Sequence, residues 1–383
     1  MLSKASVFAF VLLMHFFTLF TSGGLGFKND ISFEVIAYST IDVLFSCLLV
    51  VIVLAKFPSI FSNSEEVFKA KYAKFFDDHY IFIAILVIAT AYQAYSSIGL
   101  IMSGAARHQL LQEHDRGGVI YMISSGFFKM LVPMVFYFGA SKKVKFLSVL
   151  GLLFVCAITA SRSELKYVIN FYIMLMLFSS SKNQLARVGI IVSIMVFFAI
   201  LSTIFLQNRP IAEGAGAVLD MARSTFQYRA YPYFLADISL ETANSFYKYL
   251  YPFFGYISEA PLRIFFGTPN PIDSAYVGDL HHLGTSTITG RPYLANVLFP
   301  WWSWFVGSFG FLGLIIKVVY SYALLAVTAS QKMFFTTVVL LTFILLGSGG
   351  AHPLMTLTHV LSIFTCIAID VIISIHNKYK FKV

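Results

Sequence analysis

The chain is dominated by a succession of long apolar runs separated by shorter polar segments. A helix needs about 20 predominantly apolar residues to cross the hydrocarbon core of a bilayer, and helices satisfy their own backbone hydrogen bonds there. Runs of about this length lie at 4–21, 33–55, 80–102, 117–140, 186–206, 304–328, 332–348 and 354–375. Two shorter runs, 145–161 and 164–180, flank a polar turn. We therefore predict an all-α polytopic membrane protein with about ten transmembrane helices.

Composition agrees with this prediction. Of the 383 residues, 58% are hydrophobic and 12% are charged, which is far from the average of soluble domains. The formal net charge of +9 is spread between apolar runs rather than gathered in one patch, so nucleic acid is not expected as a partner. The first run follows Lys4 and could be a secretory signal, but no A-x-A site follows it, and we expect it to be retained.

The distribution of lysine predicts the orientation. With a cytoplasmic N-terminus, the short inner loops and the C-terminal tail hold most of the lysines, as the positive-inside rule requires. Both termini are then cytoplasmic. We expect helices 1 to 7 in residues 1–206, a large outer (periplasmic) loop domain at 207–297, and helices 8 to 10 with a cytoplasmic tail in 298–383. Short helices are expected within the outer loop at 215–229 and 241–266.

The cations of the outer face are mostly arginines, whereas the inner loops carry lysine. Arginine has a planar guanidinium that binds phosphate through two hydrogen bonds. The candidates for binding an anionic ligand are Arg162, Arg209, Arg223, Arg229 and Arg291. The alternative is that these arginines pair with nearby carboxylates, and for Arg162 that partner would be Glu164.

The outer loop also holds a group that suits acid–base chemistry. His281 and His282 are adjacent and follow Asp279, and a neutral histidine can deprotonate a hydroxyl group near physiological pH. Adjacent histidines do not readily chelate one metal ion, so no metal is predicted. His352 and Tyr228 are further candidates for lining the same cavity. The alternative is a surface histidine pair without a role.

Charged residues inside the apolar runs allow a different interpretation. A transporter of lipid-linked or small polar substrates, or a flippase, would use such groups for ion coupling. Glu34 and Asp42 lie close to one helical face, and Lys129 would supply the compensating charge, while Lys317 is a further intramembrane cation. However, the sequence has no inverted repeat of the kind that usually accompanies a transport site.

Two local motifs resemble a known family. Ala160-Ser161-Arg162-Ser163 looks like the short arginine motif that ends a span in the bacterial O-antigen polymerases and the related ligases. The stretch from Leu294 to Gly313 is similar to their return from the outer loop into a glycine-containing helix. The ligases are expected to have a histidine followed by asparagine there, but this chain has Ala295-Asn296, so the resemblance favours a polymerase.

The resemblance implies a membrane glycosyltransferase of the bacterial inner membrane. Its donor and acceptor would be oligosaccharide repeat units on undecaprenyl pyrophosphate, and it would need no cofactor or metal. The arginines named above would hold the pyrophosphate, and His281, His282 or Asp279 would act as the base. Membrane lipid is an expected partner, and a chain-length regulator protein is compatible with this role. A non-catalytic membrane protein of an assembly complex is the third hypothesis.

Overall fold

The computed structural model describes residues 2–24, 31–57, 65–103, 119–159, 163–175, 230–237, 239–240, 249–266, 281–285, 292–295, 299–346 and 352–380. The chain forms two compact units. Unit 1 comprises 1–57, 212–332 and 340–360, and unit 2 comprises 58–211, 333–339 and 361–383. Helices α16 (Phe334–Leu346) and α17 (Leu357–Lys380) each contribute residues to both units.

The structure confirms a helical membrane protein. By length and composition, five helices can cross a bilayer: Phe33–Lys56, Tyr80–Leu100, Ile120–Phe138, Leu312–Ser330 and Leu357–Ile375. Predicted runs also coincide with four further apolar helices, namely α1 (Leu2–Gly24), α7 (Lys142–Thr159), α8 (Ser163–Leu175) and α16. The run predicted at 186–206 lies outside the described residues.

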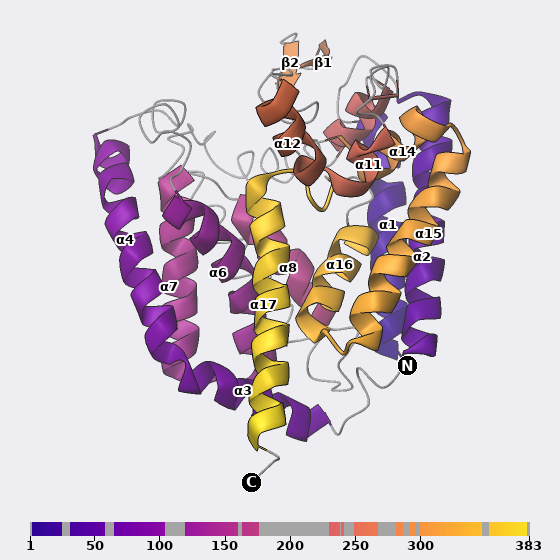
Figure 1. Ribbon diagram of the computed structural model, residues 1–383. Coiled ribbons are helices and arrows are strands. Elements are labelled where there is room, and N and C mark those ends of the chain that lie inside the picture. Colours follow the sequence, from indigo (N-terminus) through magenta and orange to yellow (C-terminus); the bar gives the residue numbers. More distant parts are fainter. Residues whose placement is uncertain are drawn as a thin grey trace. The chain divides into compact units, whose positions relative to one another are not determined.

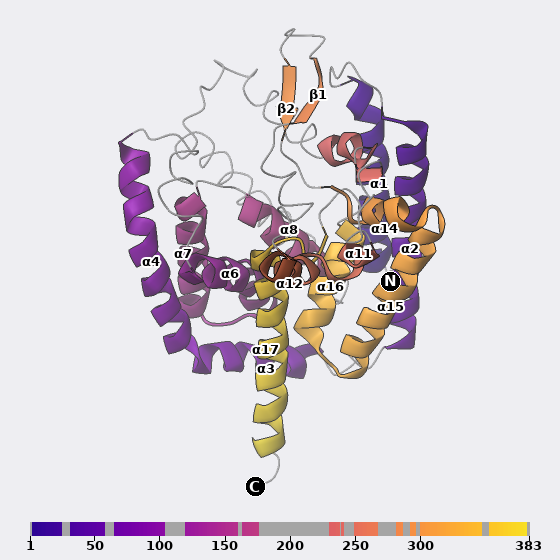
Figure 2. The same ribbon diagram turned by 45° about the horizontal axis from the view of Figure 1, so that its top comes forward.

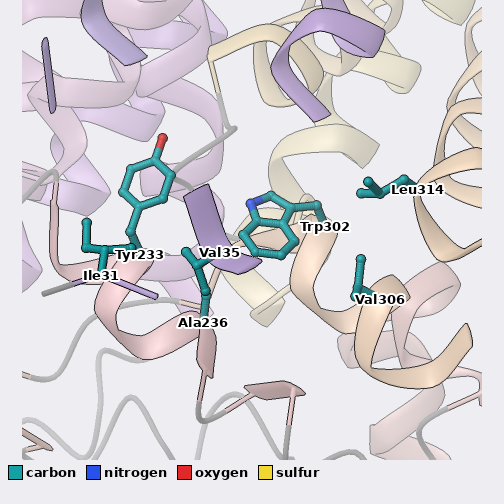
Figure 3. Close-up of a cluster of buried hydrophobic side chains, with 7 residues drawn as sticks. All are labelled: Ile31, Val35, Tyr233, Ala236, Trp302, Val306 and Leu314. Atoms are coloured by element: carbon teal, nitrogen blue, oxygen red, sulfur yellow. The ribbon is translucent and has the colours of Figure 1, made fainter. Parts of the chain in front are cut away.

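Unit 1 is built on two long helices, α2 (Phe33–Lys56) and α15 (Leu312–Ser330), which lie side by side in Figures 1 and 2. At one end of this pair, the buried indole of Trp302 packs in a hydrophobic cluster drawn from four segments of the chain (Figure 3). The cluster consists of Ile31, Val35, Tyr233, Ala236, Trp302, Val306 and Leu314. Tyr233 and Ala236 come from a short helix at 230–237, so part of the predicted outer loop belongs to the core of unit 1.

The prediction of one span over 304–328 was wrong. Instead, α14 (Trp301–Phe309) ends at Gly310, whose φ of 62° is a left-handed conformation that glycine adopts readily, and α15 begins at Leu312. Close backbone packing requires Gly313, because a β-carbon there would overlap the carbonyl of Phe305. The apolar run therefore forms two helices, since two glycines allow the chain to fold back on itself.

In unit 2, α6 (Val119–Phe138) is surrounded by several other helices. Phe127 packs edge-to-face on Phe82 of α4 (Tyr80–Met102), and Phe128 fills the space above Gly151 of α7. A β-carbon at Gly126 would meet the backbone nitrogen of Ser362 in α17 at 3.1 Å. On the remaining side, Lys129 faces α8. This central position explains why the middle of α6 is almost wholly buried.

Two elements were not predicted. The segment expected as an inner loop contains helix α3 (Glu65–Asp78), whose buried Tyr72 stacks on Phe138 at 4.8 Å between ring centroids. The outer segment contains an antiparallel ribbon of β1 (His281–Thr285) and β2 (Pro292–Ala295), so the fold is not entirely helical. The helix expected at 241–266 is described as α11 (Tyr251–Phe254) and α12 (Tyr256–Phe266), separated at Gly255, while 215–229 lies outside the described residues.

Candidate functional site

The β-ribbon joins two of the segments that the sequence analysis selected. Strand β1 begins with the histidine pair, and β2 begins directly after Arg291 and ends at Ala295. The pairing sets His281 opposite Ala295 and His282 opposite Leu294, followed by an irregularity before Thr285. The side chain of His282 is exposed. Asp279 and Arg291 lie outside the described residues.

Each of three predicted arginines stands in sequence just before a described element. Arg162 directly precedes α8, Arg229 directly precedes the helix at 230–237, and Arg291 directly precedes β2. These arginines lie outside the described residues, as do Arg209, Arg223 and Tyr228. Their role in anion binding therefore stays a prediction.

The helix after Arg229 is fixed to the first two helices of unit 1. The hydroxyl of Tyr233 is 3.0 Å from Nδ1 of His15, whose Nε2 is 3.1 Å from the hydroxyl of Thr40. Asp237 accepts a hydrogen bond of 2.7 Å from Ser32, which also caps α2. His15 is therefore a hydrogen-bonding residue inside α1, and it holds the helix that follows Arg229 in place.

His352 has both ring nitrogens engaged. Nδ1 accepts a hydrogen bond of 2.9 Å from the backbone N–H of Leu354, so the ring proton is on Nε2, which donates to the carbonyl of Pro252 at 2.9 Å. The same carbonyl accepts a hydrogen bond from Nε1 of Trp301. Burial lowers the pKa of His352 to about 3, an effect that the hydrogen bonds to backbone only partly offset. His352 is therefore a neutral residue that joins three segments of unit 1.

Several tyrosines of the outer segment are buried. Tyr231, Tyr233 and Tyr251 are at most 6% exposed, and Tyr251 packs edge-to-face on Trp304. Tyr249 is 46% exposed. Among the described tyrosines of the outer segment, the buried ones stabilise unit 1 and cannot contact a sugar in solution.

The charged residues inside the helices form two separate ion pairs. In unit 1, Nζ of Lys317 donates a hydrogen bond to Oδ1 of Asp42 and lies 5.1 Å from the ring centroid of Trp301. In unit 2, Nζ of Lys129 lies 3.6 Å from Oε2 of Glu164. The expectation that Lys129 compensates Asp42 was wrong, because each has a nearer partner within its own unit. Glu34 is exposed in the first turn of α2.

Near each ion pair, polar atoms have no hydrogen-bond partner among the described residues. In unit 1 these include Oδ2 of Asp42 and the hydroxyl of Ser321, one helical turn after Lys317. In unit 2 they include Oε2 of Glu164 and the hydroxyl of Ser125, one turn before Lys129. The charged residues were predicted from the sequence, whereas the two serines were not, because a serine in an apolar run has no distinctive signal.

Within the described ranges, no three residues of the types His, Cys, Asp and Glu are grouped closely enough to hold a metal ion. No protein-family model, no curated protein and no solved structure matches the chain. The fold and the buried pairs therefore define a helical membrane-embedded protein with paired acidic and basic side chains inside its helices.

Proposed function

We propose that the protein polymerises undecaprenyl-pyrophosphate-linked oligosaccharide repeat units, of O-antigen or capsule type, by metal-independent glycosyl transfer. In this proposal about ten spans lie in the bacterial inner membrane with both termini in the cytoplasm, and 207–297 forms the periplasmic segment. A hydroxyl of one repeat unit attacks the anomeric carbon of another. The bond from that carbon to the pyrophosphate oxygen breaks, the lipid pyrophosphate leaves, and the hydroxyl proton passes to a base.

The observation that supports this proposal most is the register of the β-ribbon. His281 lies opposite Ala295, and Asn296 follows. The antiparallel register thus sets the backbone of these two positions side by side. The position at which the resembling ligases have histidine is thus paired with a histidine from the neighbouring strand. We propose His281 as the base, with His282 and Asp279 as neighbouring groups.

The arginines before α8, the 230–237 helix and β2 supply the second requirement. A leaving pyrophosphate needs cationic hydrogen-bond donors, and guanidinium groups provide them in pairs. Arg162, Arg209, Arg223, Arg229 and Arg291 are the proposed donors.

Moving the proposed base across the ribbon tests this assignment. In proteoliposomes supplied with lipid-linked repeat units, His281→Ala is expected to slow polymerisation by about 100-fold or more. Adding Ala295→His to that variant should restore a large part of the rate, since the imidazole returns from the opposite strand. His282→Ala is the matched control and should retain most activity. Polymerisation at the wild-type rate by His281→Ala would contradict the assignment.

A transporter or flippase is the second candidate, and the pair of Asp42 and Lys317 favours it. Buried ionised groups in a membrane protein often mark an ion or substrate pathway. This function predicts substrate movement across a liposome membrane that depends on Asp42, without formation of a new glycosidic bond. Product analysis in the same proteoliposomes distinguishes the two functions.

A further inference from the structure

The ammonium group of Lys129 is buried without a hydrogen-bond acceptor among the described residues. Its side chain is 1% exposed, and its nearest carboxylate oxygen, Oε2 of Glu164, is 3.6 Å away. That distance allows Coulomb attraction but is too long for a hydrogen bond. The ring of Tyr167, with its centroid 5.1 Å from Nζ, is a further neighbour of the charge. Within the described residues, the N–H donors of Lys129 therefore have no acceptor and can bind an additional group.

Two further polar atoms of unit 2 have no hydrogen-bond partner among the described residues. Oε2 of Glu164 is buried and accepts no hydrogen bond, and the buried hydroxyl of Ser125 has no partner within the described residues. Ser125 and Lys129 are four residues apart in α6, so their side chains lie on one face of the helix. Buried polar groups normally have hydrogen-bond partners, because leaving them unpaired is costly. This arrangement is typical of a site that receives a ligand.

The first turn of α8 gives the site its preference for an anion. Glu164 lies in that turn, where backbone N–H groups have no partner inside the helix and carry partial positive charge. Anions, phosphate in particular, are favoured at such positions. The carboxylate of Glu164, which belongs to this first turn and lies 3.6 Å from the ammonium of Lys129, therefore occupies a place that suits a phosphate group.

We propose that Lys129 and the first turn of α8 form a phosphate-binding site, from which the pyrophosphate of a lipid-linked substrate displaces the carboxylate of Glu164. The identity of this substrate rests on the proposed function. A phosphate has more charge and more acceptor oxygens than the carboxylate, so it can use the donors of Lys129 that Glu164 leaves unpaired. Until the substrate arrives, Glu164 pairs with Lys129 and holds its side chain in position.

This proposal predicts that mutations of Lys129 and of Glu164 change the affinity for pyrophosphate in opposite directions. Titration of undecaprenyl pyrophosphate, without sugar, into protein in nanodiscs measures the affinity. Lys129→Gln should weaken binding by about tenfold or more, as expected for the loss of a charged hydrogen bond. Glu164→Gln should strengthen binding, because the competing carboxylate is gone. Weaker binding by Glu164→Gln, or unchanged binding by Lys129→Gln, would overturn the proposal.

Two controls keep the test independent of folding and of catalysis. The double variant Lys129→Gln/Glu164→Gln contains no unpaired charge and should bind as weakly as Lys129→Gln, so wild-type affinity in this variant would overturn the proposal. The double variant Asp42→Leu/Lys317→Met removes the matched ion pair of unit 1 without leaving an unpaired charge, and it should leave the affinity unchanged. The assay requires no turnover. If the variants bind as predicted but the protein forms no polymer, the proposed function is wrong, whereas the phosphate-binding site is still supported.

Inorganic pyrophosphate distinguishes the lipid-linked ligand from a free anion. It has the same phosphate chemistry but no lipid chain, and should bind more weakly than undecaprenyl pyrophosphate while showing the same dependence on Lys129. Equal affinity for the two ligands would overturn the assignment to a lipid-linked substrate.

Discussion

The imidazole of His352 lies directly against Gly255. A β-carbon on Gly255 would come within 2.8 Å of Nδ1 of His352 and within 2.6 Å of the carbonyl oxygen of Leu354. The φ angle of Gly255 is 48°, a conformation that favours glycine. Since His352 also binds the carbonyl of Pro252, this contact joins the loop before α17 to the break between α11 and α12.

Replacing Gly255 by alanine should therefore destabilise the protein. The backbone conformation of Gly255, with φ 48° and ψ −130°, is nearly confined to glycine and costs an L-residue about 1–3 kcal/mol, and the clash with Leu354 adds to it. We expect the free energy of unfolding to fall by at least about 2 kcal/mol, measured by denaturant titration in detergent. Gly99→Ala is the matched control, because its β-carbon would meet no atom within 4 Å. Equal stabilities of the two variants would contradict the account.

The neutral state of His352 predicts a dependence of stability on pH. Its pKa falls from 6.5 to about 3 in the folded protein, so between these values the unfolded chain binds the proton and the folded protein does not. The contribution of His352 to the free energy of unfolding is complete above pH 6.5. It decreases by about 1.4 kcal/mol per pH unit as the pH falls toward 3. In His352→Gln this part of the slope should disappear, whereas His282→Gln should keep it. An unchanged slope in His352→Gln would show that the imidazole does not remain neutral.

The effects of mutating Asp42 and Lys317 on the free energy of unfolding should be strongly non-additive. Removing one partner leaves a buried charge unpaired, and we expect Asp42→Asn or Lys317→Met to cost about 3–5 kcal/mol. The double variant Asp42→Leu/Lys317→Met removes both charges and should recover much of that loss. A double-mutant cycle of unfolding free energies measures the coupling. Additive losses would mean that the two side chains do not interact.

Asp370 stabilises the beginning of α16. Its carboxylate accepts hydrogen bonds from the backbone N–H groups of Phe335 and Thr336, at 3.1 and 2.9 Å, and from the hydroxyl of Thr336. Asp370→Asn should lower the free energy of unfolding by about 2 kcal/mol, since the charge-assisted bonds weaken. The exposed Asp78 serves as control, and Asp78→Asn should change stability by less than about 0.5 kcal/mol. Thermal unfolding of both variants tests the prediction, which fails if they behave alike.

The helices could be predicted from the sequence because lipid leaves few alternatives for an apolar run of spanning length. The break between α14 and α15 could not, since the sequence is apolar on both sides of Gly310 and the turn depends on close packing of Gly313 against Phe305. The β-ribbon was missed because its short strands carry no clear alternation of polar and apolar residues.

The site was predictable in its residue types but not in its pairings. Sequence identifies Asp42, Lys129 and Lys317 as costly charges, yet Asp42 and Lys317 are 275 residues apart, and only packing of α2 on α15 brings them together. Similarly, the opposition of His281 and Ala295 is a matter of strand register. The arginines lie outside the described residues, so experiments on the purified protein must test their role.

Whether the protein polymerises lipid-linked repeat units is tested most directly by measuring both reaction products of the purified protein. Lipid-linked repeat units are incubated in the presence of EDTA, and the glycosidic bonds formed and the undecaprenyl pyrophosphate released are counted together. Our account predicts a ladder of saccharide lengths with one lipid pyrophosphate released for each new bond, and loss of both products in Arg162→Ala. Intact repeat units after incubation with folded wild-type protein, and no released pyrophosphate, would contradict it.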